Sequence, residues 1–171
     1  MKIAIISDSH DNWPNIEKAI KYLNKQKIRL IIHCGDVCAP LTLKEMVKLF
    51  KGKQIHLVKG NVDGDVDGFK NVAKKYKKLI YHGQTGLLNL KIKNLKLKIA
   101  FCHDPFVAKK MAQSQKYDFV FHGHTHKPWQ EKIGQTTIIN PGTLAGLFSK
   151  ATFAIFDTQT KKAQLILLEK I

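Results

Sequence analysis

The first half of the chain alternates short apolar runs with longer amphipathic stretches. Residues 2–7, 29–33 and 54–59 are apolar and rich in β-branched residues, as in strands that are buried on both faces. Between these runs, residues 13–26 and 41–51 repeat their apolar positions with helical spacing. The order strand, helix, strand, helix, strand predicts a largely parallel sheet with helices packed against it.

The second half predicts a different kind of sheet. Residues 87–93 and 95–101 alternate apolar residues with lysine around Asn94, which is typical of a hairpin. A helix is expected from about 105 to 116, and further strands are expected near 118–122, 129–133, 136–140, 151–156 and 163–169. Because a single sheet of about ten strands is uncommon, one domain over residues 1–171 with two sheets fits the pattern best.

Composition narrows the class of protein. The chain has no apolar run of about 18 residues, so no transmembrane helix is expected, and the short apolar stretch after Met1 lacks the features of a signal peptide. The three cysteines, Cys34, Cys38 and Cys102, are expected to be free thiols in the cytoplasm. No membrane partner is therefore predicted.

The net charge of +16 raises the question of a nucleic-acid partner. Arg29 is the only arginine, although arginine is the usual bidentate reader of phosphate. The lysines are scattered along the chain, apart from a run over 70–78. A solvated lysine-rich surface is therefore favoured over a dedicated nucleic-acid face, which is kept as the less favoured interpretation.

Polar side chains follow nearly every predicted strand at the point where it ends. These side chains are Asp8, His10, Asp36, Asn61, His103, His124 and His126. In a sheet of this kind the carboxyl ends of the strands form the binding crevice, so all seven are expected to reach one place.

Seven oxygen and nitrogen donors are too many for one ordinary transition-metal site, but they suit two ions. The mixture of carboxylate and imidazole favours Mn, Fe, Co, Ni or Zn over Mg or Ca. Two such ions about 3.5–4 Å apart can hold a hydroxide and clamp a phosphoryl group during in-line displacement.

The ordered motifs D-x-H, G-D, G-N, a lone histidine and G-H-x-H resemble the calcineurin-like metallophosphoesterase superfamily. The stretches GNVDG, GHTHKP and NPGT resemble its small archaeal and bacterial phosphodiesterases. The resemblance implies an α/β (α+β) four-layer sandwich, in which two mixed β-sheets pack face to face with helices on the outside. It also implies a cytoplasmic phosphodiesterase that acts on a small phosphodiester through a metal-bridging hydroxide.

The resemblance also assigns roles to the seven residues. The first metal would be held by Asp8, His10 and His126, the second by Asn61, His103 and His124, and both by Asp36 as a bridge. Asp36, Asn61 and His103 would be the catalytic residues. Two divalent ions are implied, with manganese preferred and nickel, cobalt, iron or zinc as alternatives.

The chain departs from the family pattern at three positions. Many members carry a histidine after G-N that is thought to protonate the leaving group, but this chain has Val62, which predicts a preference for good leaving groups. Asp11 and Asp104 stand where the family has glycine. Both are expected to tune the metals or substrate entry from just behind the ligands, and an orientation away from the site is the alternative.

Several alternatives stay open. The chain could be a non-catalytic metal-binding scaffold, as the retromer subunit with this fold mainly is, or a nuclease acting on RNA or DNA. The acidic run 63–68 matches the first half of an EF-hand loop, but the loop's twelfth position is Lys74, so a polar turn is predicted instead. The histidines interpreted as structural are His33, His56, His82 and His122. A homo-oligomer is neither required nor excluded.

Overall fold

The computed structural model describes residues 1–92 and 95–171. Its strands are β1 (Lys2–Ile6), β2 (Leu30–His33), β3 (Gln54–Leu57), β4 (Leu79–Tyr81), β5 (Thr85–Ile92), β6 (Leu95–Cys102), β7 (Phe119–Phe121), β8 (Trp129–Ile133), β9 (Thr136–Asn140), β10 (Thr152–Asp157) and β11 (Lys162–Leu167). Its helices are α1 (Trp13–Lys25), α2 (Pro40–Leu49), α3 (Val66–Lys75), α4 (Pro105–Gln113) and the short 3₁₀ helix η1 (Leu168–Lys170).

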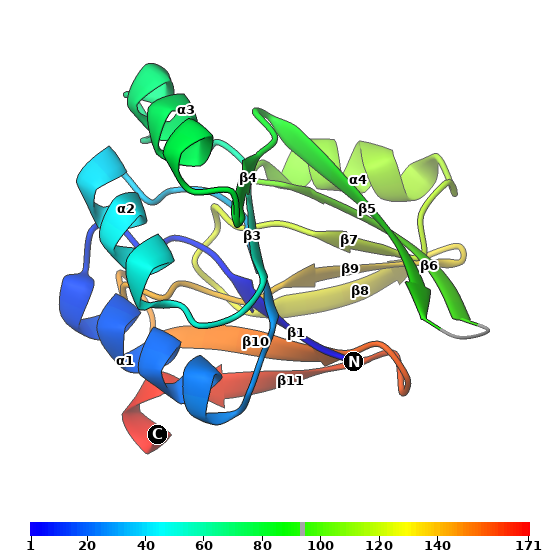
Figure 1. Ribbon diagram of the computed structural model, residues 1–171. Helices are drawn as coiled ribbons and strands as arrows, with labels where there is room; N and C mark the ends of the chain where they lie inside the picture. Colours follow the sequence, from blue (N-terminus) through cyan, green and yellow to red (C-terminus); the bar gives the residue numbers. More distant parts are fainter. Residues whose placement is uncertain (93–94) are drawn as a thin grey trace.

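The strands form two mixed sheets, and Figure 1 shows how the sheets and helices are layered. The first sheet has the order β11-β10-β1-β2-β3-β4, in which β1 to β4 are parallel and β10 and β11 are antiparallel additions. The second sheet has the order β5-β6-β7-β9-β8, with β6, β7 and β9 parallel. The predicted two-sheet α/β architecture is confirmed.

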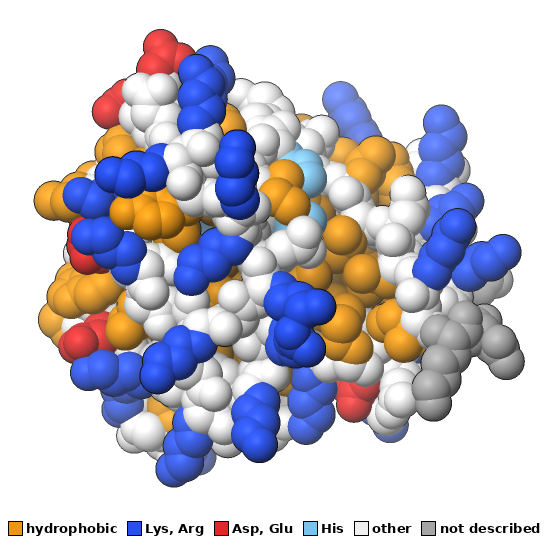
Figure 2. All heavy atoms as spheres, viewed as in Figure 1, with side chains coloured by type: hydrophobic (Ala, Val, Ile, Leu, Met, Phe, Trp, Pro, Cys, Tyr) orange, Lys and Arg blue, Asp and Glu red, His pale blue; other side chains and the backbone are white. Residues whose placement is uncertain are grey.

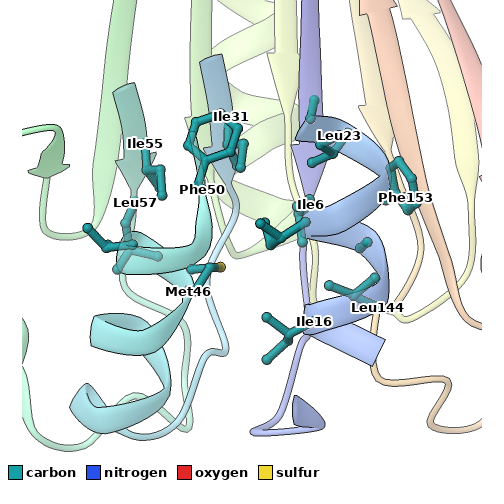
Figure 3. Close-up of a cluster of buried hydrophobic side chains, with 14 of the residues drawn as sticks. Ile6, Ile16, Leu23, Ile31, Met46, Phe50, Ile55, Leu57, Leu144 and Phe153 are labelled. Atoms are coloured by element: carbon teal, nitrogen blue, oxygen red, sulfur yellow. The ribbon is translucent and has the colours of Figure 1, made fainter. Parts of the chain in front are cut away.

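The apolar run of β1 shows why its residues form a fully buried strand. Ile3 and Ile5 pack in the cluster between the two sheets. Ala4 and Ile6 point the other way, toward α1 and α2, as alternation along a strand requires. Figure 3 shows this helix side, where Ile6 lies between α1 and α2 in the same cluster as Ile16 and Met46. A separate cluster packs α4 on the outer face of the second sheet, which completes the four layers.

The helix boundaries follow local signals. The Asn12 side chain accepts a hydrogen bond from Asn15 N at 3.3 Å, and Pro14 lies in the first turn of α1, as predicted. Helix α2 ends at Leu49, so Phe50, which we expected on its face, lies just beyond the helix and is fully buried. Its side chain still joins the core, although its backbone is extended.

The structure differs from the predicted elements at β4 and at the end of α4. Strand β4 was not predicted, because three residues after a lysine-rich segment carry too little periodicity to stand out. Helix α4 ends at Gln113 rather than near 116, with Ser114 as its C-cap. The predicted turn at Asn94, together with Lys93, lies outside the described residues, while β5 and β6 pair antiparallel on either side.

Other features agree with the composition. Cys34, Cys38 and Cys102 are free thiols. Within the described part of the chain, none of the helices has both the length and the apolar character that a membrane crossing requires.

Candidate metal centre

The structure brings the seven predicted residues together at one edge of the two sheets. Asp8 and His10 follow β1, and Asp36 follows β2. Asn61 lies in the loop after β3, and His103 follows β6 directly. The remaining two, His124 and His126, lie in the loop after β7. Both sheets therefore contribute to the same crevice, as their parallel strands predict.

Three of these side chains form a first group. His126 Nε2 lies 3.3 Å from Asp8 Oδ1 and 3.2 Å from His10 Nε2. His10 Nε2 is 4.0 Å from the same Asp8 oxygen. These three donor atoms are close enough to share one cation.

Three others form a second group. Asn61 Oδ1 lies 2.8 Å from both His103 Nε2 and His124 Nδ1. The two imidazole nitrogens are 3.2 Å apart. One amide oxygen and two imidazole nitrogens therefore converge on a single point.

Asp36 lies between the two groups. Its Oδ2 atom is 3.3 Å from His103 Nε2 and 3.8 Å from His10 Nε2. Its Oδ1 atom turns away and accepts a hydrogen bond from Val62 N at 3.0 Å. A single carboxylate oxygen thus faces both groups. Asp8, Asp36 and His103 also lie near enough to one another to offer a further set of three donors.

These donor sets fit divalent cations. In each group two imidazole nitrogens approach to 3.2 Å, and two neutral nitrogens with facing lone pairs repel unless a proton or a cation lies between them. Carboxylate, amide and imidazole donors together suit transition metals rather than calcium or magnesium. The residues present therefore fit the pair of ions that the sequence predicts.

Backbone carbonyls set the tautomers of two histidines. His103 Nδ1 donates to Cys34 O at 2.9 Å, and His126 Nδ1 donates to Leu147 O at 3.2 Å. When either ring is neutral, this hydrogen bond leaves the lone pair of Nε2 directed at its group, which is the form that binds a metal. His10 differs, because its Nδ1 faces Cys38 Sγ at 3.7 Å.

The two carboxylates have opposite electrostatic environments. Burial raises the pKa of Asp8, since its side chain is fully inaccessible to water. Burial also acts on Asp36, but the hydrogen bond and charge of His103 outweigh it and hold the pKa of Asp36 below its usual value. Burial lowers the pKa of His103, yet Asp36 more than reverses this and leaves that pKa raised. A cation would relieve the cost of charging Asp8.

The loops that carry the ligands are backbone-strained. Asp8, His10, Asp36, His124 and His126 all have positive φ angles, between 40° and 72°. Residues other than glycine seldom adopt this region, and such strain gathers at functional sites where the surrounding structure enforces it. The loops therefore hold these side chains in set directions.

Glycines beside the ligands make room for the carboxylates. A side chain at Gly60 would collide with the Asp36 carboxylate, and one at Gly123 would collide with Ser7 and Asp8. Gly35 acts differently, because its φ of 95° requires glycine. These glycines let the ligand loops approach one another closely.

Asp63 connects two of the loops that carry the proposed ligands, a position that we did not predict from the sequence. The structure places it fully buried, where Oδ2 accepts hydrogen bonds from Asp36 N at 2.9 Å and Gly60 N at 2.7 Å. Its Oδ1 accepts from Cys38 N at 2.8 Å. The carboxylate therefore ties the loop after β2 to the loop after β3. The available signal was its position two residues beyond Asn61, which we interpreted only as part of a polar turn.

Asp11 and Asp104 lie outside both donor groups. Asp11 Oδ1 accepts a hydrogen bond from Ala39 N at 3.1 Å. Asp104 Oδ1 accepts from Phe106 N at 2.7 Å and from Val107 N at 2.9 Å, which caps α4. Neither carboxylate joins a donor group, although Asp104 also lines a cavity beside the second group.

The histidines interpreted as structural also lie outside both groups. His122 is buried, and its Nδ1 donates to Gly123 O at 2.9 Å. His33 Nε2 is 3.1 Å from Ser9 Oγ. His56 and His82 pair with each other at 2.9 Å. Of the three alternating histidines at 122, 124 and 126, only the last two reach the donor groups.

A cavity of about 370 Å³ opens beside the second group. It is lined by Lys59, Gly60, Asn61, Gln84, Thr85, Cys102, His103, Asp104, Val107 and His124. Asn61 and His124 are exposed there, whereas Asp8 and His126 of the first group are buried. A small molecule in this cavity would reach the second group directly.

Comparisons with known proteins agree with this geometry. Residues 1–161 match the family model of the calcineurin-like phosphoesterase superfamily domain. A Methanocaldococcus jannaschii protein named phosphodiesterase MJ0936 is 35% identical over 170 residues, which cover 99% of this chain and 100% of that protein.

Solved structures share the fold. The structure of an archaeal phosphodiesterase matches with a TM-score of 0.83 and 32% identity, over 98% of this chain and 99% of that one. Vps29 of Chaetomium thermophilum matches with a TM-score of 0.70 and 15% identity, over 98% and 94% of the two chains. The second likeness concerns the fold alone.

Proposed function

The chain belongs to the calcineurin-like phosphoesterase superfamily, and from this premise we propose that it is a phosphodiesterase that works with two divalent metal ions. Asp36 Oδ2 carries the proposal, because it lies 3.3 Å from His103 of one donor group and 3.8 Å from His10 of the other. Similarity to a protein named phosphodiesterase supports a diester rather than a monoester substrate.

In this proposal each group would hold one ion, and Asp36 would be a ligand shared by both. The proposed ligands are Asp8, His10 and His126 for one ion and Asn61, His103 and His124 for the other. Manganese is the proposed metal, with nickel, cobalt, iron and zinc as alternatives that the same donors accept. When bound, two such ions acidify a water molecule for attack and polarise the phosphoryl oxygens.

The chain's own residues orient the site. The carbonyls of Cys34 and Leu147 hold His103 and His126 in the metal-binding tautomer. Val62 is 43% exposed at the position where many family members carry a proton-donating histidine. No imidazole donates a proton to the departing oxygen from that position, so we propose that the enzyme prefers esters with good leaving groups.

The surface supports a small substrate. Figure 2 shows lysine and arginine side chains spread over the whole viewed face rather than gathered along one groove. In α3, Lys70, Lys74 and Lys75 are exposed to solvent, and Lys77 just after the helix is exposed as well. The free thiols agree with the proposed cytoplasmic location. A nuclease would instead show activity that falls steeply with salt.

The proposal is tested by metal add-back. Protein stripped of metal is supplied with Mn, Ni, Co, Zn or Mg, or with nothing, and hydrolysis of bis(p-nitrophenyl) phosphate is compared with that of p-nitrophenyl phosphate. We expect diester turnover only with a transition metal. Metal bound at two ions per chain without turnover of either ester would contradict the phosphodiesterase proposal and favour the scaffold alternative.

A further inference from the structure

Phe148 is exposed where the fold gives it no core to join. Among the described residues it is the most exposed large hydrophobic side chain, at 91%. Its ring centroid lies 5.5 Å from that of His126, a member of the first donor group. A phenylalanine gains stability only when it is buried, so this ring does not serve the folded core. It is placed where a bound molecule would contact it.

The loop that carries Phe148 is fastened to His126 on both sides. His126 Nδ1 donates to Leu147 O at 3.2 Å, and Ser149 Oγ donates to His126 O at 2.7 Å. Phe148 stands between these two anchor points. The ring therefore keeps a defined position relative to the first donor group.

The backbone at Phe148 is also unfavourable for its residue type. Its φ angle is 62°, which is an outlier for a bulky side chain. Gly146, two residues earlier, has a φ of 76°, so the same loop uses glycine where it needs this conformation. If only the turn mattered, glycine would serve at 148 as well. Strain at a bulky, exposed side chain marks Phe148 as a candidate functional position.

The two ends of the metal centre offer different surfaces to a substrate. The cavity of about 370 Å³ lies beside Asn61 and His124 of the second group. The Phe148 ring lies beside His126 of the first group. A phosphodiester carries two ester groups on one phosphorus, so a phosphoryl group held between the donor groups can direct one ester group to each end.

We propose that Phe148 is a specificity-determining residue, whose ring stacks on a planar aromatic ring in one ester group of the phosphodiester substrate. The inference rests on the proposed phosphodiesterase function. Aromatic faces pack favourably on one another, and an aliphatic ester group makes no such contact. The shared chemistry is a flat ring, from either an aryl group or a nucleobase.

The test compares competitive inhibitors that differ in this ring. Methyl p-nitrophenyl phosphate is the reporter substrate for manganese-loaded protein. Diphenyl phosphate, diethyl phosphate and thymidylyl-(3′→5′)-thymidine are the inhibitors. The variants are Phe148→Ala, Phe148→Leu and Phe148→Trp, with Phe106→Ala as the matched control, because Phe106 is also a projecting phenylalanine, 77% exposed.

We expect Phe148→Ala and Phe148→Leu to raise the inhibition constant of diphenyl phosphate about tenfold, the size of one lost stacking contact. The constant for diethyl phosphate should stay unchanged, and Phe148→Trp should retain tight binding of diphenyl phosphate. A parallel rise for thymidylyl-(3′→5′)-thymidine identifies the ring as a nucleobase. A rise for diphenyl phosphate alone identifies an aryl group. Manganese content should equal that of the wild type.

Equal changes for diphenyl and diethyl phosphate, or no change for either, would overturn the inference. A larger effect from Phe106→Ala than from Phe148→Ala would overturn it too. Calorimetric titration of metal-loaded protein with diphenyl phosphate repeats the comparison without turnover. Wild-type protein that hydrolyses no diester would refute the proposed function, while the calorimetric difference between Phe148 and alanine would still decide the role of the ring.

Discussion

The two ends of the candidate metal centre differ in their access to water. At the first group Asp8 is fully buried, and the side chain of His126 is only 11% exposed. At the second group Asn61 and His124 are exposed and line the cavity. Asp36, which is 2% exposed, lies between the two. The first group is therefore the more enclosed, with His10 as its most exposed side chain at 17%. The second group opens to the cavity through Asn61 and His124, although His103 is only 6% exposed.

This difference shows that burial can give two similar sets of donor atoms different properties. Burial raises the pKa of Asp8, so that carboxylate gains most from a cation. The pKa of Asp36 is lowered by His103 in spite of burial, so it is ionised and ready to serve both ends. We therefore expect an ion at the first group to exchange more slowly than one at the second.

Removing the Asp36 carboxylate should lower metal binding at both donor groups, so that the difference between them disappears. In Asp36→Ala both ions lose a ligand, so we expect metal content to fall at both ends and kcat/KM to drop by about a thousandfold or more, as when one member of a catalytic unit is removed. Metal analysis and diester hydrolysis measure this. Asp11→Asn is the control, since the Asp11 carboxylate lies outside both donor groups and asparagine tolerates its φ of 52°. Wild-type turnover in Asp36→Ala would contradict the two-metal mechanism.

Rescue by added imidazole should distinguish the more enclosed donor group from the more open one. His10→Gly and His124→Gly suit the positive φ angles of 40° and 72° at these positions, and each should reduce kcat/KM by about a hundredfold or more. Added imidazole should restore more activity to His124→Gly, which opens on the cavity, than to His10→Gly, where the replaced side chain is only 17% exposed. Rescue of both variants to the same extent would contradict the difference in access.

Weakening the Asp63 hydrogen bonds between the loops after β2 and β3 should lower metal affinity at both donor groups, but by less than the loss of a ligand. In Asp63→Asn one carboxylate oxygen becomes an NH₂ group that cannot accept the hydrogen bond of Cys38 N. We expect the free energy of unfolding to fall by about 1–3 kcal/mol, the cost of a buried unsatisfied group. Metal affinity should fall about 10- to 100-fold.

Urea unfolding and metal titration measure these two effects. Asp65→Asn is the matched control in the same loop, because Asp65 caps α3 and asparagine caps helices equally well. If both variants behaved like the wild type, Asp63 would have no positioning role.

The smallest expected effect is a pH dependence of folding stability that arises from His33, which lies behind the first donor group. Burial lowers the pKa of His33 to about 3 from its ordinary 6.5. The His33 ring contacts the side chain of Ser9, which lies between Asp8 and His10 in the sequence. Below pH 6.5 the His33 side chain is protonated in the unfolded chain, whereas in the folded chain it stays neutral down to about pH 3. The stability that His33 contributes is therefore complete above pH 6.5 and declines as pH falls from 6.5 toward 3.

Replacing this histidine should flatten the acid side of the stability profile. In His33→Gln the decline should lessen by up to about 1.4 kcal/mol per pH unit. Urea unfolding between pH 7.5 and pH 5 measures it. An unchanged slope would show that His33 is not the group that titrates.

Much of the fold was predictable because its signals are local. The apolar runs at β1, β2 and β3 and the helical spacing of α1 each extend over several residues and agree with the final elements. Strand β4 escaped prediction because it has only three residues, and its pairing with β3 is a tertiary event. The assignment of seven residues as ligands stays a prediction, although the structure brings all seven within reach of two points.

The sequence by itself determined which donors this protein carries and at which strand ends they stand, because residue type and hydrophobic period are local properties. It indicated the family through the order of those donors. Only the tertiary structure decided that Asp63 joins two ligand loops and that Phe148 stands beside His126. Those relations depend on where the two sheets meet and on how each loop bends, and no periodic pattern along the chain records them. The same packing made one end of the metal centre buried and left the other open.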